Sequence, residues 1–541
     1  MSDEATRDFR REPATPSLHP FEQQSVASLL ETRATLSKDE PFLIFAPFEG
    51  ETRRWTYGQF ATDVARVAAG LAGLGVGHGQ RVVVLLDNCP EALLVFFACA
   101  WLGAVCVPVN TQSTASEFAY FVARSAAVGI VTQRRLLDVA RSAATSQWLI
   151  VAETDSAQAS SNDIPFASLY RDPVSCNRVD SQAHATVLFT SGTTSRPKGV
   201  VWTHANVLWG AKMGALQEGL RRDDVHLVFL PLFHVVALTW SILPTMWAGG
   251  CAVLQPKFSA SRFWEAALAH RCTWASMVPF CTAVLAKQPV PEHHFFRCWG
   301  HALFSAEYER RFGVQLLGWW GMTELVTQGL VGDTRLPQTH GSIGRPSVGY
   351  EIAILDEPGR PVGLGEAGEL CVRGRRGVSL FLEYLDDADA TRCAFDAQGY
   401  FRTGDRVTLR SDGTIQFVDR LKDVIKVGGE NVAAPEVERV IAMIAGVQEV
   451  AVVAKRDPAL GEVPVAFVKA NVSGEAANRL VTGVLTACRQ QLAKFKVPRD
   501  VVLVDDFPRV AIGKVAKAEL RKRLADSDQA GVADRRDVHP H

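Results

Sequence analysis

A short segment rich in hydroxyl side chains, TSGTTSRPKGV at residues 190–200, has the composition of a phosphate-binding loop. Its hydroxyl groups belong to Thr190, Ser191, Thr193, Thr194 and Ser195. Gly192 would let the backbone approach an anion closely, and Lys198 supplies a positive charge. On composition alone, an ordinary Ser/Thr turn between two strands is an equally good interpretation.

The spacing of this segment resembles a Walker P-loop, but two decisive residues are wrong. A Walker loop needs Gly just before its Lys, to curl around phosphate, and Ser or Thr just after it, to bind Mg²⁺. Here these positions hold Pro197, which has no N–H, and Gly199, which has no hydroxyl. The Walker interpretation therefore fails, and a phosphate-binding loop of another kind remains.

The chain around this segment alternates between helical and strand patterns. Apolar side chains recur at helical spacing at Phe60, Val64, Val67, Leu71 and Leu74. The run RVVVLL at 81–86 predicts a short buried strand, and Pro90 predicts the start of the next helix. Strand, helix and strand at this spacing indicate βαβ units, so we predict an α/β fold with a parallel sheet.

A change in the pattern of expected strands and helices near residue 420 predicts a second, smaller domain. The segments EVAVVAKRDP and VPVAFVKANV look like short strands, and a helical pattern follows at 476–492. We therefore expect a flexible lead at 1–20, a large N-terminal domain at 21–419 and a C-terminal domain at 420–541, with a loose tail from about 525.

Charge and cysteine content narrow the class of protein. The 57 Lys and Arg residues nearly balance 58 Asp and Glu, which gives no basic excess for nucleic acid or an anionic membrane. The eleven cysteines are scattered, without a C-x-x-C pair, and this pattern predicts free thiols in a reducing compartment. The first residues are charged and contain no apolar run, so we expect no secretory signal and a cytoplasmic location.

Two apolar runs, at 92–109 and 235–254, are long enough to span a bilayer. The first contains Gly103 and Pro108, and the second is broken by Pro244 and a Gly-Gly pair. We interpret both as buried helix-to-strand units of an α/β core and expect no integral membrane segment.

The order of several motifs gives the hydroxyl-rich segment a meaning. The motifs are LGAVCVPVN (102–110), LFTSGTTSRPKGVVWTH (188–204), LPLFH (230–234), WGMTE (320–324), GELCVRG (368–374), GYFRTGD (399–405), DRLKDVIKVGGENV (419–432) and PRVAIGK (508–514). Together they resemble the adenylate-forming superfamily of acyl-CoA synthetases, aryl-CoA ligases, luciferases and peptide-synthetase adenylation domains. Together with KFKVP, which ends at Pro498, these motifs look most like the crotonobetaine/carnitine-CoA ligase branch.

This resemblance implies a fold and a reaction. The fold would be a large N-terminal α/β domain of stacked mixed and parallel sheets with flanking helices, plus a small, mobile α+β C-terminal domain. The enzyme would convert a carboxylate and ATP into an acyl-adenylate and pyrophosphate, and CoA thiol would then release AMP. Its partners would be a small carboxylic acid, ATP with Mg²⁺, and CoA, without nucleic acid, and a homodimer is compatible with the resemblance.

The resemblance assigns phosphate and metal contacts to two segments. The loop would hold the β- and γ-phosphates through Thr190, Ser191, Gly192, Thr193, Thr194 and Lys198. Glu324 would hold Mg²⁺ together with Thr194, because a hard cation prefers oxygen ligands. Thr323 would contact the α-phosphate. Without these neighbours, Glu324 would be better explained as a solvated acid at a helix start.

Further positions would hold the nucleoside. Trp320 stands where the family usually has an adenine-stacking aromatic residue, most often Tyr, and it can stack but lacks the hydroxyl. We assign its neighbour Trp319 to core packing. Asp405 would bind the ribose hydroxyls, with Arg420 supporting ribose or phosphate, although an isolated Asp in TGD is more often a turn residue. GHALF at 300–304 loosely resembles the adenine-flanking turn.

The C-terminal segment would supply the groups that move between steps. Lys514 would reach the carboxylate and the α-phosphate in the first step, although Val510 stands where the family commonly has Thr. Lys422 lies at the expected hinge, and Gly428 and Gly429 would let the backbone approach the pantetheine arm. Outside these motifs, the lysine would be an ordinary solvated residue and the glycine pair a hairpin turn.

His234, in LPLFH, would gate the carboxylate pocket, although a single histidine in an apolar stretch is usually a core residue. The pocket would be lined by 232–240, 276–282, 300–305 and 325–332. These segments are mostly apolar and aromatic, which favours an alkyl, alicyclic or aryl acid over a strongly polar one.

Two other functions stay open at this point. The protein could be an adenylating enzyme that delivers its acyl group to a carrier protein or stops at the adenylate. It could also be a non-catalytic nucleotide-binding relative. Turnover with CoA alone separates the first of these from a ligase, and pyrophosphate exchange into ATP separates the second.

Overall fold

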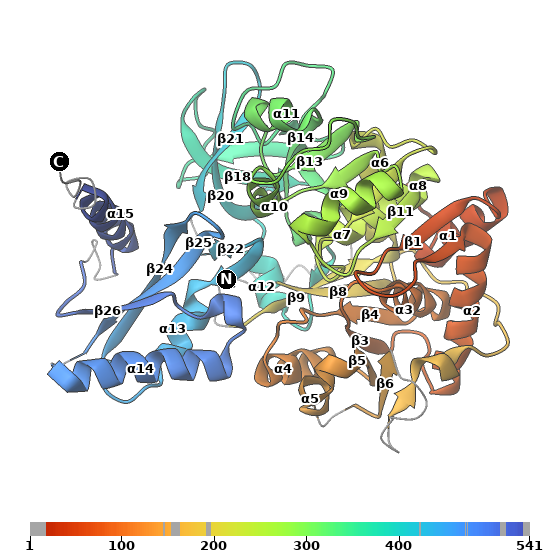
Figure 1. The fold of residues 1–541 in the computed structure, drawn as a ribbon, viewed down its shortest axis with the longest axis horizontal. Coiled ribbons are helices and arrows are strands. Elements are labelled where there is room, and N and C mark those ends of the chain that lie inside the picture. The colour runs from red at the N-terminus through yellow and green to blue at the C-terminus, as the bar shows by residue number, and fades with distance from the viewer. Residues whose placement is uncertain are drawn as a thin grey trace, which may run out of the picture.

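Four β-sheets form the framework of the protein, whose computed structural model describes residues 18–533 apart from 144–145, 153–162, 191–195, 421–423, 471, 473 and 509–514. Three sheets belong to the N-terminal part of the chain and one to the C-terminal part (Figure 1). This arrangement has the predicted α/β class and the predicted large and small parts.

The eight-stranded sheet carries the strands on either side of the hydroxyl-rich segment, in the order β19-β9-β8-β4-β3-β5-β6-β7. Its strands are β3 (Arg81–Leu85), β4 (Val105–Pro108), β5 (Gly129–Gln133), β6 (Trp148–Ala152), β7 (Ile164–Pro165), β8 (His184–Thr190), β9 (Lys198–Thr203) and β19 (Glu383–Tyr384). Neighbours from β8 to β7 are parallel, whereas β8, β9 and β19 pair antiparallel. Thr190 and Lys198 are the last pair of the antiparallel β8–β9 ladder, so the residues between them connect these two strands.

The nine-stranded sheet has the order β16-β15-β14-β13-β12-β10-β11-β1-β2. Its strands are β1 (Pro41–Phe45), β2 (Arg53–Thr56), β10 (Val225–Val228), β11 (Cys251–Leu254), β12 (Trp274–Ser276), β13 (Cys298–His301), β14 (Gln315–Gly321), β15 (Gln328–Val331) and β16 (Arg345–Pro346). Its central strands are parallel, and antiparallel strands lie at both edges.

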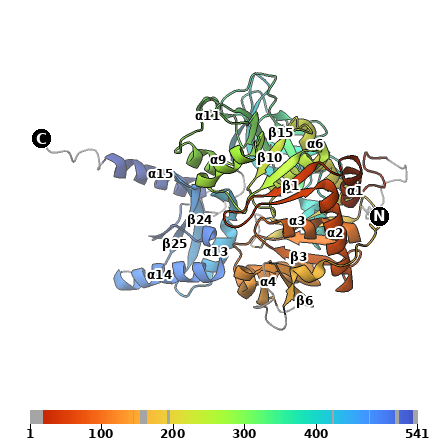
Figure 2. The same ribbon diagram turned by 45° about the vertical axis from the view of Figure 1, so that its right-hand side comes forward.

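Helices fill the space between these two sheets and cover their outer faces. Those of the N-terminal part are α1 (Val26–Leu36), α2 (Tyr57–Gly73), α3 (Pro90–Leu102), α4 (Ala115–Ser125), α5 (Leu137–Arg141), α6 (His204–Gln217), α7 (Val235–Ala237), α8 (Leu243–Ala248), α9 (Ala260–Ala269), α10 (Pro279–Leu285), α11 (Ala306–Phe312) and α12 (Ala388–Cys393). Figure 2 shows α2 and α3 between β1 and β3, with α4 on the far side of β3. Every residue of α3 except Glu91 is buried, because a helix between two sheets has no polar face to present to water.

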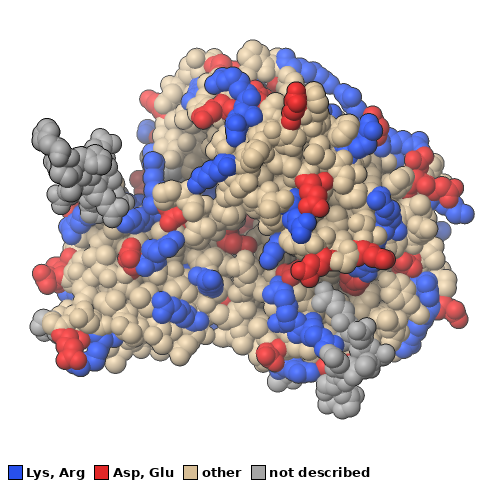
Figure 3. All heavy atoms as spheres, viewed as in Figure 1, with Lys and Arg blue, Asp and Glu red and all other residues tan. Residues whose placement is uncertain are grey.

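Both apolar runs fold as predicted. The run 92–109 forms α3 and then β4, and 235–254 forms α7, a π-helical turn at Leu238–Ile242, α8 and then β11. In the part of the chain that the structure describes, no helix combines the length and the apolar character needed to cross a bilayer. Charges of both signs are interspersed on the face seen in Figure 3, as expected from the balanced composition.

Two smaller sheets follow. The antiparallel four-stranded sheet contains β17 (Glu351–Leu355), β18 (Ala367–Arg373), β20 (Phe401–Leu409) and β21 (Ile415–Arg420). The C-terminal sheet contains β22 (Val424–Val427), β23 (Glu430–Ala433), β24 (Glu449–Asp457), β25 (Gly461–Lys469) and β26 (Asp500–Val504), with α13 (Ala434–Ala442), α14 (Gly474–Gln491) and α15 (Lys517–Ala533). The chain passes from the first of these sheets to the second near residue 420, where we predicted a domain boundary.

Two described segments near the ends of the chain extend past the predicted bounds of the ordered part. His19, inside the predicted flexible lead, is buried, and its Nε2 lies 3.2 Å from the Ser181 hydroxyl. At the other end, α15 continues to Ala533, past the residue where we expected a loose tail to begin. Short polar segments at chain ends carry no periodic pattern, so their tertiary contacts leave no sequence signal.

The fold yields a stability prediction at Asn206, the buried third residue of α6. Its side-chain amide donates to the backbone carbonyls of Val378 (2.7 Å) and Leu380 (2.8 Å), and its side-chain oxygen accepts from the Thr203 N–H. Asn206→Ala removes three hydrogen bonds in a buried setting, so we expect a loss of about 3 kcal/mol in the free energy of unfolding. Denaturant unfolding measures this loss.

The matched control is Gln59, which occupies the same helix position in α2 and accepts from the Thr56 N–H in an exposed setting. Gln59→Ala should cost only about 0.5 kcal/mol, because water replaces the lost contact. Equal losses in the two variants would contradict the structural role given to Asn206.

Candidate active site

Two predicted nucleoside-binding residues meet where the nine-stranded and four-stranded sheets adjoin. Trp320 lies near the end of β14 and Asp405 in the middle of β20. The indole Nε1–H of Trp320 donates to Oδ2 of Asp405 over 2.8 Å, and both residues are buried. This position therefore makes a polar contact through the indole N–H, although it has no tyrosine hydroxyl.

Arg420 lies beside this pair through strand register. In the antiparallel ladder of β20 and β21, the Cα of Asp405 is directly opposite the Cα of Arg420. Residues directly opposite each other in such a ladder are nearest neighbours across the two strands. The register therefore brings the predicted ribose-binding residue and its predicted supporting residue to one place on the sheet.

Glu324, the predicted metal ligand, lies in a 3₁₀ turn at Thr323–Leu325 directly after WGM. Its Oε1 accepts a hydrogen bond of 2.8 Å from the hydroxyl of Tyr384, and both side chains are buried. Burial, followed by the neighbouring charge of Glu324, raises the pKa of Tyr384 well above its ordinary value, so the phenol stays protonated and donates. The solvated acid that we considered as an alternative is excluded by this burial.

Backbone contacts hold the turn around Glu324. The carbonyl of Thr323 accepts from the indole N–H of Trp202 over 2.9 Å, and the carbonyl of Glu324 accepts from the N–H of Phe381 over 2.8 Å. These donors come from β9 and from the segment before β19, which are the strands next to the hydroxyl-rich loop. The eight-stranded sheet thus positions the metal-ligand candidate of the nine-stranded one.

Lys198 reaches the same cluster through an aromatic ring. Its Nζ lies 4.6 Å from the centroid of the Tyr384 ring, whose hydroxyl bonds to Glu324. A cation over an aromatic face is attracted by the ring quadrupole. Lys198, Tyr384 and Glu324 therefore form a series from the base of the phosphate loop to the candidate metal ligand.

Several predicted site residues lie outside the described residues. They are Ser191, Gly192, Thr193, Thr194, Lys422 and Lys514. Thr190 and Lys198, which flank the loop, are described and are paired across β8 and β9. The roles of the undescribed residues stay predictions.

His234 lies between the N-terminal and C-terminal parts of the protein and is not a core histidine. Its ring Nε2 is 3.1 Å from Oε2 of Glu430, and the Asn110 side-chain amide donates to the same oxygen over 3.2 Å. Gly428 and Gly429 form the adjacent β22–β23 turn with φ of +59° and +98°, in the left-handed region that favours glycine. A Cβ added to Gly429 would lie 3.8 Å from the Val278 side chain, so this turn faces the N-terminal domain.

Two of the predicted pocket segments meet at His301. Its Nδ1 is 2.6 Å from the carbonyl of Leu303 and its Nε2 is 3.0 Å from the hydroxyl of Thr282. Burial lowers the pKa of His301 to about 4, so the ring is neutral near pH 7. A carbonyl can only accept, so the short contact with Leu303 favours the tautomer whose proton is on Nδ1.

Part of another predicted pocket segment, 232–240, lines an apolar pocket. Its lining includes Leu86, Phe96, Val109, Leu232, Phe233 and Leu238. Trp240, from the same segment, is instead buried against Trp319, with ring centroids 5.2 Å apart. Trp319 therefore has the core role that we assigned to it.

Sequence comparison covers both parts of the chain. Residues 30–385 match the family of AMP-binding enzymes, and residues 436–514 match the AMP-binding enzyme C-terminal domain. The chain belongs to the AMP-binding enzyme family. The family and fold class expected from the ordered motifs are confirmed.

Relatives of this AMP-binding enzyme match it along nearly their whole length. A crotonobetaine/carnitine–CoA ligase from Salmonella paratyphi B is 33% identical over 519 residues, 92% of this chain and 99% of that protein. A double mutant of o-succinylbenzoate CoA synthetase from Bacillus subtilis, solved with a product analogue, OSB-NCoA, has a TM-score of 0.78, with 27% identity over 92% of this chain and 98% of that one. The same synthetase solved with AMP has a TM-score of 0.66, with 26% identity over 91% of this chain and 98% of that one.

Tyr384, Asn110 and Glu430 are the site residues that we did not predict. Asn110 and Glu430 lie within the quoted motifs VPVN and GGENV, so their proximity to His234 could have been suspected from the motifs alone. Tyr384 lies in a strand of two residues, which is too short for any periodic signal.

The paired tryptophans provide a test of the nucleoside site. Trp320→Phe keeps an aromatic ring but removes the N–H that orients the Asp405 carboxylate, so we expect AMP to bind about tenfold more weakly. Trp319→Phe should lower the melting temperature but leave the affinity for AMP within about twofold, because its ring lies in the core. Calorimetric titration with AMP measures both. A larger loss of affinity for AMP in Trp319→Phe would refute the assignment.

Proposed function

We propose that the protein is an ATP-dependent acid–CoA ligase that forms AMP. In the first step an oxygen of the substrate carboxylate attacks the α-phosphorus of ATP, and pyrophosphate leaves. In the second, the sulfur of CoA attacks the acyl carbon of the adenylate, AMP leaves, and the thiol proton is lost to solvent. The single observation that carries this proposal is the meeting of Trp320 with Asp405 at a sheet junction, in a chain of a family whose full-length relatives are CoA ligases and synthetases.

The first step requires positive charge and oriented donors, because both reactants are anionic. In the proposal Trp320 and Asp405 hold adenine and ribose, with Arg420 beside them and Thr323 at the α-phosphate. Thr190, the undescribed loop residues Ser191 to Thr194, and Lys198 hold the departing pyrophosphate. Lys514 approaches the reacting oxygens from the C-terminal domain.

The Mg²⁺ that accompanies ATP fits the residues present. Such an ion is usually held by one or two protein oxygens together with phosphate and water. Glu324 offers a buried carboxylate, positioned by Tyr384, and Thr194 is the proposed second ligand. When bound, the ion neutralises charge on the phosphates.

The arrangement of the C-terminal domain suits the second step. The Gly428–Gly429 turn is the part of that domain next to His234. Pro508 and Val515, which flank the segment containing Lys514, belong to the C-terminal domain: the carbonyl of Pro508 accepts from Ala516, and Val515 packs with Phe467 and Leu520. Figures 1 and 2 both show the following helix, α15, on the side of the C-terminal sheet away from α1 to α3.

The two structures of the Bacillus synthetase support the same interpretation. They are almost equally identical to this chain, yet the TM-score is 0.78 for the complex with a CoA-containing product analogue and 0.66 for the complex with AMP. We propose that the two complexes differ in domain arrangement and that this difference accounts for the gap. We therefore propose that the C-terminal domain rotates about Lys422 to bring Lys514 to the site in the first step.

The acid that fits best is apolar. His301 is neutral, its hydrogen bonds to Leu303 and Thr282 are internal, and the pocket behind Leu232 and Phe233 has an apolar lining. Such surroundings favour alkyl, alicyclic or aryl acids. A cytoplasmic location agrees with eleven free cysteines, and a homodimer remains a proposal for light scattering to test.

Separate assays of the two steps test the proposal. Lys514→Ala should slow acid-dependent exchange of pyrophosphate into ATP by at least about a hundredfold, as expected for the loss of a charge aligned with the transition state. The same variant should convert supplied acyl-adenylate and CoA to thioester at a rate within about threefold of wild type. A panel of alkyl, alicyclic and aryl acids identifies the substrate for both assays.

Lys522, an exposed lysine of α15, provides the matched control, and Lys522→Ala should change neither step. Wild-type exchange in Lys514→Ala would refute the assigned mechanism. Acyl-adenylate that accumulates and is not consumed by CoA would instead point to delivery to a carrier protein.

A further inference from the structure

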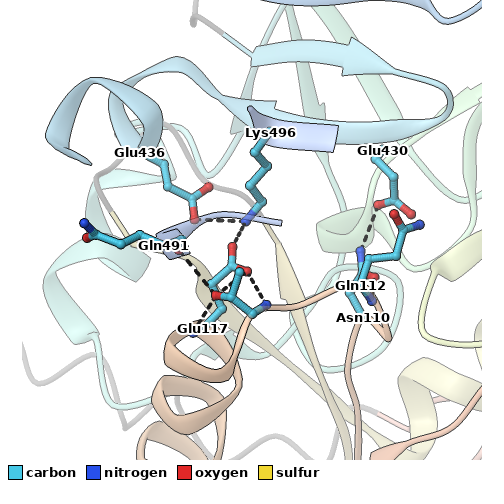
Figure 4. Close-up of polar contacts among 8 residues, drawn as sticks. Asn110, Gln112, Glu117, Glu430, Glu436, Gln491 and Lys496 are labelled. Carbon is cyan, nitrogen blue, oxygen red and sulfur yellow. Dashed lines mark hydrogen bonds and ion pairs between the residues drawn. The ribbon is translucent and has the colours of Figure 1, made fainter. Parts of the chain in front are cut away.

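A buried ion-pair cluster of Glu117, Glu436 and Lys496, none of which is assigned a role in the site, joins the two domains (Figure 4). Lys496, in the 3₁₀ turn Lys494–Lys496 after α14, places its Nζ 2.5 Å from Oε1 of Glu117 and 2.9 Å from Oε1 of Glu436. The three side chains are 8%, 9% and 4% exposed. Glu436 belongs to the same domain as Lys496, whereas Glu117 belongs to α4 of the N-terminal domain, so only one of the two contacts crosses between domains.

Glu117 is oriented by its own helix before the C-terminal domain arrives. It is the third residue of α4, and its Oε2 accepts from the backbone N–H of Thr114 over 2.8 Å in a capping box. This contact leaves Oε1 directed at Lys496. The Thr114 hydroxyl also lies 3.3 Å from the carbonyl of Gln491, the last residue of α14, so the start of α4 meets the end of α14, and their dipoles attract.

The second partner of Lys496 makes the interdomain contact reversible. Burial alone would lower the pKa of Lys496, but the charges of Glu436 and Glu117 outweigh burial and raise it, so the ammonium is charged. If the domains separate, Lys496 keeps Glu436 and Glu117 keeps Thr114. Each charged group then keeps one partner. Separation therefore costs less free energy than breaking a buried ion pair that leaves a charge unpaired.

This cluster lies in the same interdomain interface as the Gly428–Gly429 turn. Figure 4 shows Glu430 with Asn110 on one side and Lys496 with Glu117 on the other. Glu430 bonds Asn110 and His234 next to Gly428 and Gly429, so the two contacts attach the C-terminal domain at separate points. Attachment at one point leaves the domain free to rotate about any axis, whereas attachment at two points restricts rotation to the single axis that joins them.

We propose that the Lys496–Glu117 ion pair holds the C-terminal domain in the orientation that presents the Gly428–Gly429 turn to His234. The pair thereby favours the thioester-forming step without touching a substrate. Glu117 and Lys496 are positioning residues in this account, which rests on the proposed ligase function. The first step, performed in another orientation, does not need the pair.

Glu117→Gln tests this proposal, because glutamine retains the capping box of α4 while removing the charge that attracts Lys496. Conversion of supplied acyl-adenylate and CoA to thioester should fall about tenfold, within the usual range of coupling between distant groups, while pyrophosphate exchange into ATP stays within about threefold of wild type. Glu436→Gln is the matched control: it also removes one carboxylate of the cluster, but within one domain, so the thioester step should stay within about threefold. Equal slowing of both steps by Glu117→Gln, or equal loss of the thioester step in both variants, would overturn the proposal.

Amide hydrogen exchange provides a second test of the proposal that needs no substrate. In wild-type protein without ligands, peptides covering 110–120 and 425–433 should exchange more slowly than in Glu117→Gln, while α2 and α3 exchange alike in both. Unchanged exchange at 110–120 and 425–433 would overturn the proposed positioning. Failure of every acid to support pyrophosphate exchange would refute the ligase function instead, so the two failures are distinguishable.

Discussion

The hydrogen bond from the indole of Trp320 to Asp405 is the contact on which the site depends. It joins the end of β14 to the middle of β20, and thereby ties the nine-stranded sheet to the four-stranded sheet whose next strand leads into the C-terminal domain. Because both residues are buried, the bond has little competition from water. The proposed nucleoside position lies at this bond, and the register of β20 and β21 places Arg420, which precedes the proposed hinge, opposite Asp405.

A second constraint is the handling of charge near phosphate. The reaction needs positive charge and a metal ion, but a buried carboxylate such as Glu324 is costly unless it has partners. Tyr384 supplies one partner through its hydroxyl, and Lys198 lies over the ring of the same tyrosine. Asn206 of α6 bonds the carbonyls of Val378 and Leu380 in the segment that leads to Tyr384, so an amide in the core supports the position of the partner of Glu324.

Much of this architecture could be predicted from sequence because it depends on local pattern. The apolar run 92–109 reads as a helix and a strand, and the ordered motifs identify the family before any coordinate is known. Contacts between distant segments could not be predicted in the same way. The sequence shows that Trp320 lacks the tyrosine hydroxyl, but only the fold brings Oδ2 of Asp405 within 2.8 Å of its indole Nε1.

Lys496 illustrates the limit most clearly. KFKVP contributed only to the family resemblance, because the partner that gives Lys496 a role, Glu117, is 379 residues away in sequence. Glu117 completes the capping box of α4 with one of its carboxylate oxygens. Its second oxygen acquires another role only where the two domains meet.

A single-turnover experiment tests the central claim most directly. Protein in excess over an accepted acid is mixed with ATP and Mg²⁺, quenched and separated, and CoA is added to a parallel sample. The account predicts one acyl-adenylate and one pyrophosphate per acid consumed before CoA, and equal amounts of acyl-CoA and AMP after it. Formation of ADP and phosphate, or of AMP without acid, would contradict it.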